Sequence, residues 1–210
     1  MPDPISWEFA WPYLLTAFVA SYFLGSIAFG TLLTRATGAG DLTKIGSGST
    51  GATNVLRTGR KGLAALTMAL DAAKGAVAVL IASQWGPDMA IFASLGVFFG
   101  HLYPVWLKFR GGKGVATYIG ILLGLSWPIA LIFLATWLAT ALLTRISSVS
   151  ALVASVSAPL AFSWMGERQF METAIFFAVL IFFTHRANIA RLVRGQEPKI
   201  GNTSTRADSV

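Results

Sequence analysis

The sequence predicts an all-α integral membrane protein, a bundle of seven transmembrane helices with an external N-terminus and a cytoplasmic C-terminus. Three observations support this fold class. Of the 210 residues, 55% are hydrophobic and 12% are charged, whereas roughly 25% of the residues are charged in an average soluble domain. Apolar runs long enough to cross a bilayer recur along the chain. Lys and Arg residues gather in alternate connections between these runs, as the positive-inside rule requires.

Seven apolar runs give the predicted spans. A helix needs about 20 apolar residues to cross the hydrocarbon, and shorter helices occur inside bundles. The predicted spans, in chain order, are residues 11–34, 62–83, 89–107, 115–125, 128–143, 149–165 and 170–184. The fourth is short, so we expect it either to begin inside the glycine-rich loop before it or to cross only part of the bilayer.

The first three spans carry polar or small residues within their apolar sequence. In the second span, Asp71 and Lys74 are three residues apart and can pair. Charges inside a membrane are candidates for function, but a structural ion pair that braces the bundle is the simpler interpretation. His101, near the end of the third span, is interpreted as a packed histidine and not as a general base. The first span has small residues at a spacing typical of helix packing: Ser21, Gly25, Ser26 and Gly30.

The positions of the charges set the predicted orientation. With seven crossings and an external N-terminus, fourteen of the 16 Lys and Arg residues lie on the inner side, whereas Lys74 lies in a span and Arg168 lies outside. Membrane topology therefore explains the formal charge of +7. We therefore expect no nucleic-acid partner.

The chain is predicted to form one transmembrane domain, residues 1–201. Its polar, glycine-rich segments are the inner loops at residues 35–61, 108–117, 144–150 and 185–199, where we place the functional site. Residues 202–210 are predicted to be a disordered tail. No clear internal repeat is visible, which disfavours an inverted-repeat transporter.

The composition also excludes several kinds of chemistry. No Cys is present, which removes disulfides, thiol nucleophiles and Cys-based metal sites. Only His101 and His185 remain as nitrogen ligands, so we expect no metal and no other cofactor. The Walker A spacing of nucleotide hydrolases is absent, and so is the G-x-S-x-G pattern of serine hydrolases.

The first polar motif is "KIGSGSTGATNVLRTGRKG", residues 44–62. Its glycines, its hydroxyl groups and Asn54 allow the chain to fold back and point N–H and O–H donors at one anion. Arg57 can make a bidentate contact to a phosphate. A flexible inner loop with topogenic cations is the alternative interpretation.

The second motif is "KFRGGKGVAT", residues 108–117, between two apolar segments. The backbone N–H groups of Gly111, Gly112 and Gly114, beside Lys and Arg, are typical of a cradle for phosphate or carboxylate. Lys113 immediately precedes an apolar segment, so the partial positive charge of a helix N-terminus can add to its own. A plain inner loop is the alternative.

The third motif is "FFTHRANIARLVRG", residues 182–195, at the end of the last span. His185 and Asn188 are three residues apart and share a helix face. Arg191 and Arg194 are predicted to form a snorkelling basic collar at the membrane surface. A collar needs neither the histidine nor the asparagine, so those two residues indicate a site.

A shorter motif, "TRISSVSAL", residues 144–152, offers three serine hydroxyls. A serine nucleophile needs a base and a group that orients the base, and no such signature is present. We interpret Ser147, Ser148 and Ser150 as hydrogen-bond donors and not as nucleophiles.

Taken together, "GSGSTGATNVLR", "LDAAKG", "GHLYPVWLKFRGGKGVAT" and "HRANIARLVRGQEPKIG" resemble the bacterial acyl-phosphate glycerol-3-phosphate acyltransferase family. The similarity runs from residue 41 to residue 201, and several spaced motifs in one order are more specific than any single one. One departure is that the first family motif usually reads G-S-G-N, whereas Ser49 replaces the Asn here. We leave Ser49 outside the predicted core site.

The resemblance implies an enzyme that moves a fatty acyl group from acyl phosphate to the sn-1 hydroxyl of glycerol 3-phosphate. The products are lysophosphatidic acid and phosphate, in the first step of membrane phospholipid synthesis. The family implies direct attack without a cofactor, in a bacterial inner membrane with the active site facing the cytoplasm. The implied partners are the two substrates, membrane lipid and the soluble enzyme that makes acyl phosphate.

The resemblance also implies roles for particular residues. Catalytic roles are implied for Ser47, Arg57, Lys113, Ser148, His185 and Asn188. Substrate phosphate binding is implied for Ser47, Arg57, Gly111, Gly112, Lys113, Gly114, His185 and Asn188. Further candidates are Asn54, Glu197 and Ser150, which lies only two residues from Ser148.

Two other classes of function compete with an enzyme. In a transporter or channel for organic phosphates, the same cations would line an entry vestibule. The missing repeat and the scarcity of charges in the deeper spans disfavour it. A non-catalytic membrane assembly factor has no positive support in the sequence.

Overall fold

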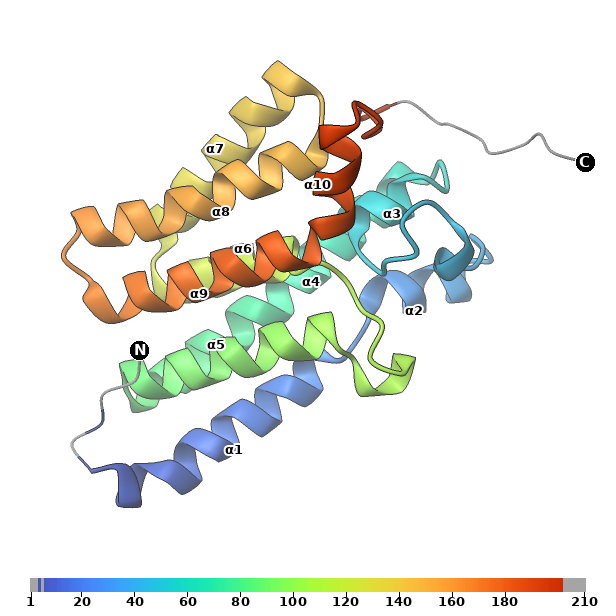
Figure 1. Ribbon diagram of the computed structural model, residues 1–210. Helices are drawn as coiled ribbons and strands as arrows, with labels where there is room; N and C mark the ends of the chain where they lie inside the picture. Colours follow the sequence, from blue (N-terminus) through green and yellow to red (C-terminus); the bar gives the residue numbers. More distant parts are fainter. Residues whose placement is uncertain (1–3, 5, 202–210) are drawn as a thin grey trace, which may run out of the picture.

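The computed structural model describes residue 4 and residues 6–201, and within them every regular element is a helix (Figure 1). The α-helices are α1 Trp7–Gly25, α2 Phe29–Ala36, α3 Ala52–Leu56, α4 Lys61–Ala82, α5 Pro87–Leu102, α6 Val115–Leu125, α7 Trp127–Thr144, α8 Ser147–Trp164, α9 Arg168–Thr184 and α10 Arg186–Val193. Short 3₁₀ turns are η1 Leu42–Lys44, η2 Ser83–Trp85 and η3 Val105–Leu107. The all-α prediction is confirmed for this part of the chain. The predicted tail at 202–210 lies outside the described residues.

The helices form two packed groups that α6 joins. Helix α1 packs on α5, and α4 packs on α5 and α6, whereas α7, α8 and α9 pack in succession (Figure 1). Helix α6 contacts α4, α7 and α9. Where α5, α6, α7 and α9 meet, the rings of Phe98, Tyr118, Phe133 and Phe177 are fully buried and lie edge-on or tilted to one another. Such aromatic contacts hold the centre of the bundle together.

The helices of the described chain are suited to a membrane. Five segments are long and apolar enough to cross: Trp7–Ala36, Lys61–Trp85, Pro87–Leu107, Trp127–Thr144 and Ser147–Trp164. Helices α9 and α10 are bent by 61° and make a sixth if they are counted as one span, and Val115–Leu125 is a shorter apolar helix. Large apolar side chains also face outward, as Leu142 and Leu143 do. The chain is therefore a multi-pass membrane protein.

The first predicted span differs from the structure because it is interrupted at residues 26–28, between α1 and α2. The break leaves the carbonyl of Ile27 without its helical partner, and Lys74 Nζ donates to that oxygen over 2.7 Å. Helix α2 also lies close to the first loop, because a Cβ on Gly30 would come within 2.0 Å of the Thr50 carbonyl oxygen. The break thus turns the chain toward the polar end of the bundle.

Two other features of the spans were predictable. Asp71 and Lys74 pair over 2.8 Å, as their spacing predicts. Small residues bring α1 against α5, because a Cβ on Gly25 would lie 2.2 Å from the Val97 carbonyl oxygen and one on Gly96 2.1 Å from that of Phe18. Close helix contact through glycine is a common packing mode in membranes.

Candidate active site

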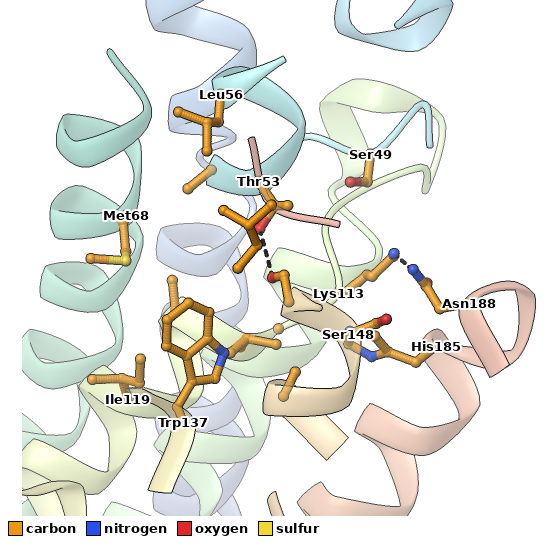
Figure 2. A pocket seen from close by; sticks show the side chains of 18 of the residues that line it. Ser49, Thr53, Leu56, Met68, Lys113, Ile119, Trp137, Ser148, His185 and Asn188 are labelled. Carbon is orange, nitrogen blue, oxygen red and sulfur yellow. Dashed lines mark hydrogen bonds between the residues drawn. The ribbon is translucent and has the colours of Figure 1, made fainter. Parts of the chain in front are cut away.

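One cavity of about 650 Å³ opens at the end of the bundle where α3, α10, the start of α8 and the loop before α6 meet. Its walls differ in character (Figure 2). The polar wall includes Ser47, Ser49, Arg57, Lys113, Ser148, His185, Asn188 and Glu197. The apolar wall includes Met68, Ile119, Leu131, Leu134, Trp137 and Leu138, from α4, α6 and α7. The cavity therefore joins a site for charged groups to a site for hydrocarbon.

The first loop, residues 37–60, is organised around the buried side chain of Asn54. Its Nδ2 donates to the carbonyls of Leu42 and Ser49 over 3.0 and 2.9 Å, and its Oδ1 accepts from the Ser47 N–H over 3.2 Å. This cross-linking brings Ser47 and Ser49 together, with their hydroxyls 3.0 Å apart. Asn54 itself does not line the cavity, so it shapes the loop and does not meet a ligand directly.

Arg57 reaches the cavity from the end of α3. Its Nη1 lies 3.4 Å from Asn54 Oδ1. A Cβ on Gly46, whose φ is +52°, would come within 2.2 Å of the same Nη1. Gly46 thus supplies both the left-handed backbone and the space that Arg57 occupies.

The second loop, residues 108–114, is closed by its own backbone. Gly111 N–H donates to the Leu102 carbonyl over 3.0 Å, and Gly112 N–H donates to the His101 carbonyl over 3.1 Å. Neither glycine lines the cavity. The expectation that these two N–H groups bind phosphate is therefore corrected, because they already satisfy the carbonyls at the end of α5. They shape the turn instead.

Gly114 and the start of α6 do face the cavity. Gly114 has φ +90° and precedes the first residue of α6, and Gly114, Val115 and Ala116 all line the pocket. The first N–H groups of a helix have no partner inside it and carry a partial positive charge. The donors that remain for an anion are thus at the N-terminus of α6.

Lys113 is fixed from two sides. Its Nζ donates to Asn188 Oδ1 over 2.5 Å (Figure 2), and its carbonyl accepts from the Thr184 hydroxyl over 3.2 Å. Burial lowers the pKa of Lys113 to about 8, with the like charges of Arg191 and Arg57 acting in the same direction. Glu197 opposes this shift. The lysine is thus a cation near neutral pH whose charge is little solvated.

Glu197 links the segments around the lysine. Its Oε1 accepts from Ser148 Oγ over 2.8 Å and from Asn188 Nδ2 over 2.5 Å, and its Oε2 accepts from Arg191 Nε over 2.7 Å. Burial raises the pKa of this carboxyl, but the three hydrogen bonds outweigh it and hold the pKa below its ordinary value. One carboxylate therefore ties the start of α8 to α10.

His185 occupies the bend between α9 and α10. Its side chain is buried, and Nδ1 donates to the Ile181 carbonyl over 2.8 Å. Since Nδ1 carries the proton in this contact, Nε2 of the neutral ring is an acceptor. Burial, with the charge of Lys113, lowers the pKa of His185 to about 4. The imidazole is therefore neutral at physiological pH and a weak base.

The sequence profile of a family described as glycerol-3-phosphate acyltransferase matches residues 15–195 of this chain. The chain belongs to this glycerol-3-phosphate acyltransferase family. A glycerol-3-phosphate acyltransferase from Mesorhizobium japonicum is 57% identical over 188 residues, which cover 90% of this chain and 96% of the relative. One from Brucella anthropi is 57% identical over 191 residues, covering 90% and 94%.

Solved structures of an integral membrane glycerol 3-phosphate acyltransferase, PlsY, share the fold. Its glycerol 3-phosphate form has a TM-score of 0.87 and 36% identity and covers 93% of this chain and 99% of that one. Its lysophosphatidic acid form has a TM-score of 0.84 and 36% identity and covers 90% and 95%. The arrangement of helices here is thus that of a membrane acyltransferase.

The acyltransferase fold brings most of the predicted residues together. Ser47, Arg57, Lys113, Gly114, Ser148, His185, Asn188 and Glu197 all line one cavity. Ser148 points to Glu197, whereas the Ser150 hydroxyl donates to the Ile146 carbonyl within α8 and does not line the cavity. The geometry therefore favours Ser148 over Ser150 as the serine of this segment.

The sequence interpretation missed several residues of this acyltransferase cavity. Ser49, left outside the core site, lies on its wall, and Thr53 and Ser147 approach each other there at 3.4 Å between hydroxyls. Arg191, predicted to be part of a collar, does not line the cavity but pairs with Glu197, which does. The signal for Arg191 was its spacing of three residues from Asn188, which puts both on one face of α10.

Proposed function

We propose that the protein transfers a fatty acyl group from acyl phosphate to the sn-1 hydroxyl of glycerol 3-phosphate, the first step of membrane phospholipid synthesis. The observation that supports this most is the single cavity with a cationic polar wall and an apolar wall. A reaction between a lipid-soluble donor and a small phosphorylated acceptor needs both a polar wall for the phosphates and an apolar wall for the acyl chain. The products are lysophosphatidic acid and inorganic phosphate.

The polar wall fits substrate phosphates. Glu197 lies on the same wall of the cavity and pairs with Arg191 over 2.7 Å. Arg57 and Lys113 line the cavity with the N-terminus of α6. Positive side chains beside helix N–H groups stabilise phosphate oxygens, and the effect is stronger where water is excluded.

The apolar wall fits the acyl chain. The side chains of Leu131, Leu138 and Met68 are each about half exposed in the bundle, and they lie on helices that are suited to contact lipid. An acyl chain can therefore lie along α7 while its phosphate stays near Lys113. Burial of apolar surface stabilises this placement by roughly 25 cal/mol per Å².

The geometry supports direct transfer without an acyl-enzyme. The sn-1 hydroxyl oxygen attacks the acyl carbonyl carbon, the bond from that carbon to the phosphate oxygen breaks, and phosphate leaves. Ser148 donates to a carboxylate and not to a histidine, so no activated nucleophile is built around it. Acyl phosphate is already an activated mixed anhydride, so the reaction needs no activated nucleophile from the protein.

We assign the hydroxyl proton to a substrate phosphate oxygen. His185, with a pKa of about 4, is a weaker base than a phosphate group, whose second pKa is about 6. His185 Nε2 and Asn188 orient the glycerol 3-phosphate, and Lys113 and Arg57 stabilise the charge that develops on the departing phosphate. No cofactor takes part in this scheme.

We further propose seven crossings, with the N-terminus outside and the cavity facing the cytoplasm of a bacterial inner membrane. Support comes from the five long spans, the bent α9–α10 pair and short α6, and from the distribution of cations. This orientation exposes the cavity to glycerol 3-phosphate and to a soluble enzyme that makes acyl phosphate. A reporter fused after Val210 should be cytoplasmic and one at Met1 external. Both termini on one side would contradict seven crossings.

The test of function uses the purified protein in detergent with acyl phosphate and glycerol 3-phosphate. We expect phosphate release that depends on both substrates, with one lysophosphatidic acid formed for each phosphate released. Acyl-CoA in place of acyl phosphate should give no product, because the sequence has no evident motif for binding a nucleotide or pantetheine carrier. Comparable turnover with acyl-CoA would contradict the choice of donor. Uptake of glycerol 3-phosphate into vesicles without chemistry would instead support a transporter.

A further inference from the structure

A buried polar cluster, Asp71, Lys74 and His101, lies behind the second loop. The three side chains are between 1% and 5% exposed, and Asp71 and His101 also line the cavity. We propose that Asp71 and His101 are positioning residues for the reaction. They hold the second loop in the position where Lys113 can contact the substrate phosphate. The inference rests on the proposed function, since it assigns Lys113 a role in transfer.

His101 contacts the loop through both its backbone and its ring. Its carbonyl accepts from the Gly112 N–H over 3.1 Å. Its ring lies directly against Gly112, because a Cβ built on that glycine would come within 2.1 Å of Nε2 and 2.7 Å of Cε1. No φ in the left-handed region constrains Gly112, so the ring of His101 is what excludes a side chain there. Lys113 is the next residue.

Asp71 lies beside the other nitrogen of the ring, at a distance that suits an ion pair and is too long for a hydrogen bond. Its Oδ1 lies 3.6 Å from His101 Nδ1 and 2.8 Å from Lys74 Nζ. Lys74 Nζ in turn donates to the Ile27 carbonyl at the break between α1 and α2, and lies 5.7 Å from the centre of the Phe29 ring. The carboxylate thus joins α4, α5 and the α1–α2 break at one point beneath the loop.

Simple bracing of the bundle does not explain this placement. Ionisable groups are costly between membrane helices, and well-packed apolar residues hold helices together at least as well. Elsewhere α4 and α6 meet through Gly75 and Gly120, which press directly against backbone carbonyls. The polar cluster instead lies where the cavity, the loop and the helix break meet. That position suits a support for Lys113.

The first test removes the ring of His101, adds a methyl group at Gly112, and then combines the two changes. His101→Asn removes the ring atoms that lie under Gly112, and we expect kcat/KM to fall about tenfold. Gly112→Ala adds a methyl group that collides with the ring and should also lose about tenfold. In the double variant the methyl group occupies the space that the ring leaves, so its kcat/KM should exceed that of both single variants.

Matched variants show whether the rescue is specific. A Cβ on Gly111 meets the His101 carbonyl oxygen at 2.1 Å and not the ring, so His101→Asn should not rescue Gly111→Ala. Ser94 is a fully buried residue of α5 whose hydroxyl donates to the Ile91 carbonyl within the helix. Ser94→Ala should keep wild-type kcat/KM, and thermal unfolding in detergent should report any loss of stability in each variant.

The second test asks whether the cluster acts through the lysine. In a Lys113→Ala background, His101→Asn and Asp71→Asn should each change the residual kcat/KM by less than about twofold, because residues that act through one group are not additive. In the wild-type background Asp71→Asn should lose about as much as His101→Asn. This test needs no Gly112 variant, so it decides the matter if Gly112→Ala does not fold.

The outcomes separate the inference from the proposed function. Wild-type protein without acyl transfer would overturn both. Active wild-type protein with unchanged kcat/KM in His101→Asn, no rescue in the double variant, or full additivity with Lys113→Ala would overturn the positioning role alone.

Discussion

The two glycine-rich loops of the site are built in different ways. In the first loop, glycines adopt positive φ at Gly38, Gly40, Gly46, Gly48 and Gly59, and a Cβ would meet no atom within 4 Å at Gly38, Gly51 and Gly59. In the second loop, a Cβ on Gly111, Gly112 or Gly114 would meet an atom at 2.1 to 2.5 Å. Most glycines of the first loop are therefore required by their backbone conformation, whereas those of the second loop are required by close contact with neighbouring atoms.

The cations of the two loops differ in the same way. Arg57 is partly exposed, and its guanidinium makes a long hydrogen bond, 3.4 Å, to Asn54. Lys113 is held at its amine by Asn188 and at its carbonyl by Thr184. We therefore expect the side chain of Arg57 to adjust to a substrate, whereas Lys113 presents its charge in a fixed place. Fixed charges stabilise a transition state without reorganisation during the reaction.

Gly114→Ala should give the largest effect, because it breaks the second loop in two ways. The φ of +90° is unfavourable for alanine by about 1–2 kcal/mol, and the Cβ would come within 2.5 Å of the Phe98 ring. We expect kcat/KM to fall about a hundredfold and the unfolding temperature in detergent to drop. Wild-type activity in a folded variant would show that the second loop can adapt.

Lys113→Arg and Lys113→Ala should follow, each with a loss of at least about tenfold in kcat/KM, roughly 1.4 kcal/mol. Arginine keeps the charge, but its planar guanidinium does not fit the place of an amine held by Asn188. Steady-state kinetics with both substrates measure the loss. Lys108→Arg, outside the cavity, is the control and should match wild type, and equal activity in Lys113→Arg would reduce Lys113 to a topology signal.

Gly59→Ala should give the smallest effect. Its φ is +81°, but a methyl group would meet nothing within 4 Å, so only backbone strain of about 1–2 kcal/mol opposes it. We expect a lower unfolding temperature with kcat/KM within about twofold of wild type. A tenfold loss of activity would erase the contrast between the loops.

Most of the long helices, and most of the residues that line the candidate cavity, were predictable from the sequence because their signals are local. The short span at residues 115–125 has the bounds of α6, since a glycine precedes it and Ser126 follows its apolar run. The motifs likewise predicted that Lys113 and Asn188 belong to one site, and their side chains bond directly.

The rest depends on contacts between distant segments. The break at residues 26–28 is satisfied by Lys74, 47 residues away from Ile27, and nothing near the break in sequence announces that partner. Gly111 and Gly112 resemble anion binders in composition, but their N–H groups satisfy carbonyls at the end of α5. The sequence predicted that Arg191 is a surface cation, whereas in the structure it pairs with Glu197, six residues further along the chain.

The pH dependence of kcat/KM tests most directly whether the charge of Lys113 contributes to acyl transfer. The pKa of Lys113 is about 8, so the amine is protonated below this pH and loses its charge as the pH rises through it. Because kcat/KM reports ionisations of the free enzyme, we expect wild-type kcat/KM to fall above about pH 8. In Lys113→Arg the guanidinium stays charged, so this alkaline fall should disappear from the weaker activity that remains. An identical alkaline fall in both proteins, after correction for hydrolysis of acyl phosphate without enzyme, would contradict the account.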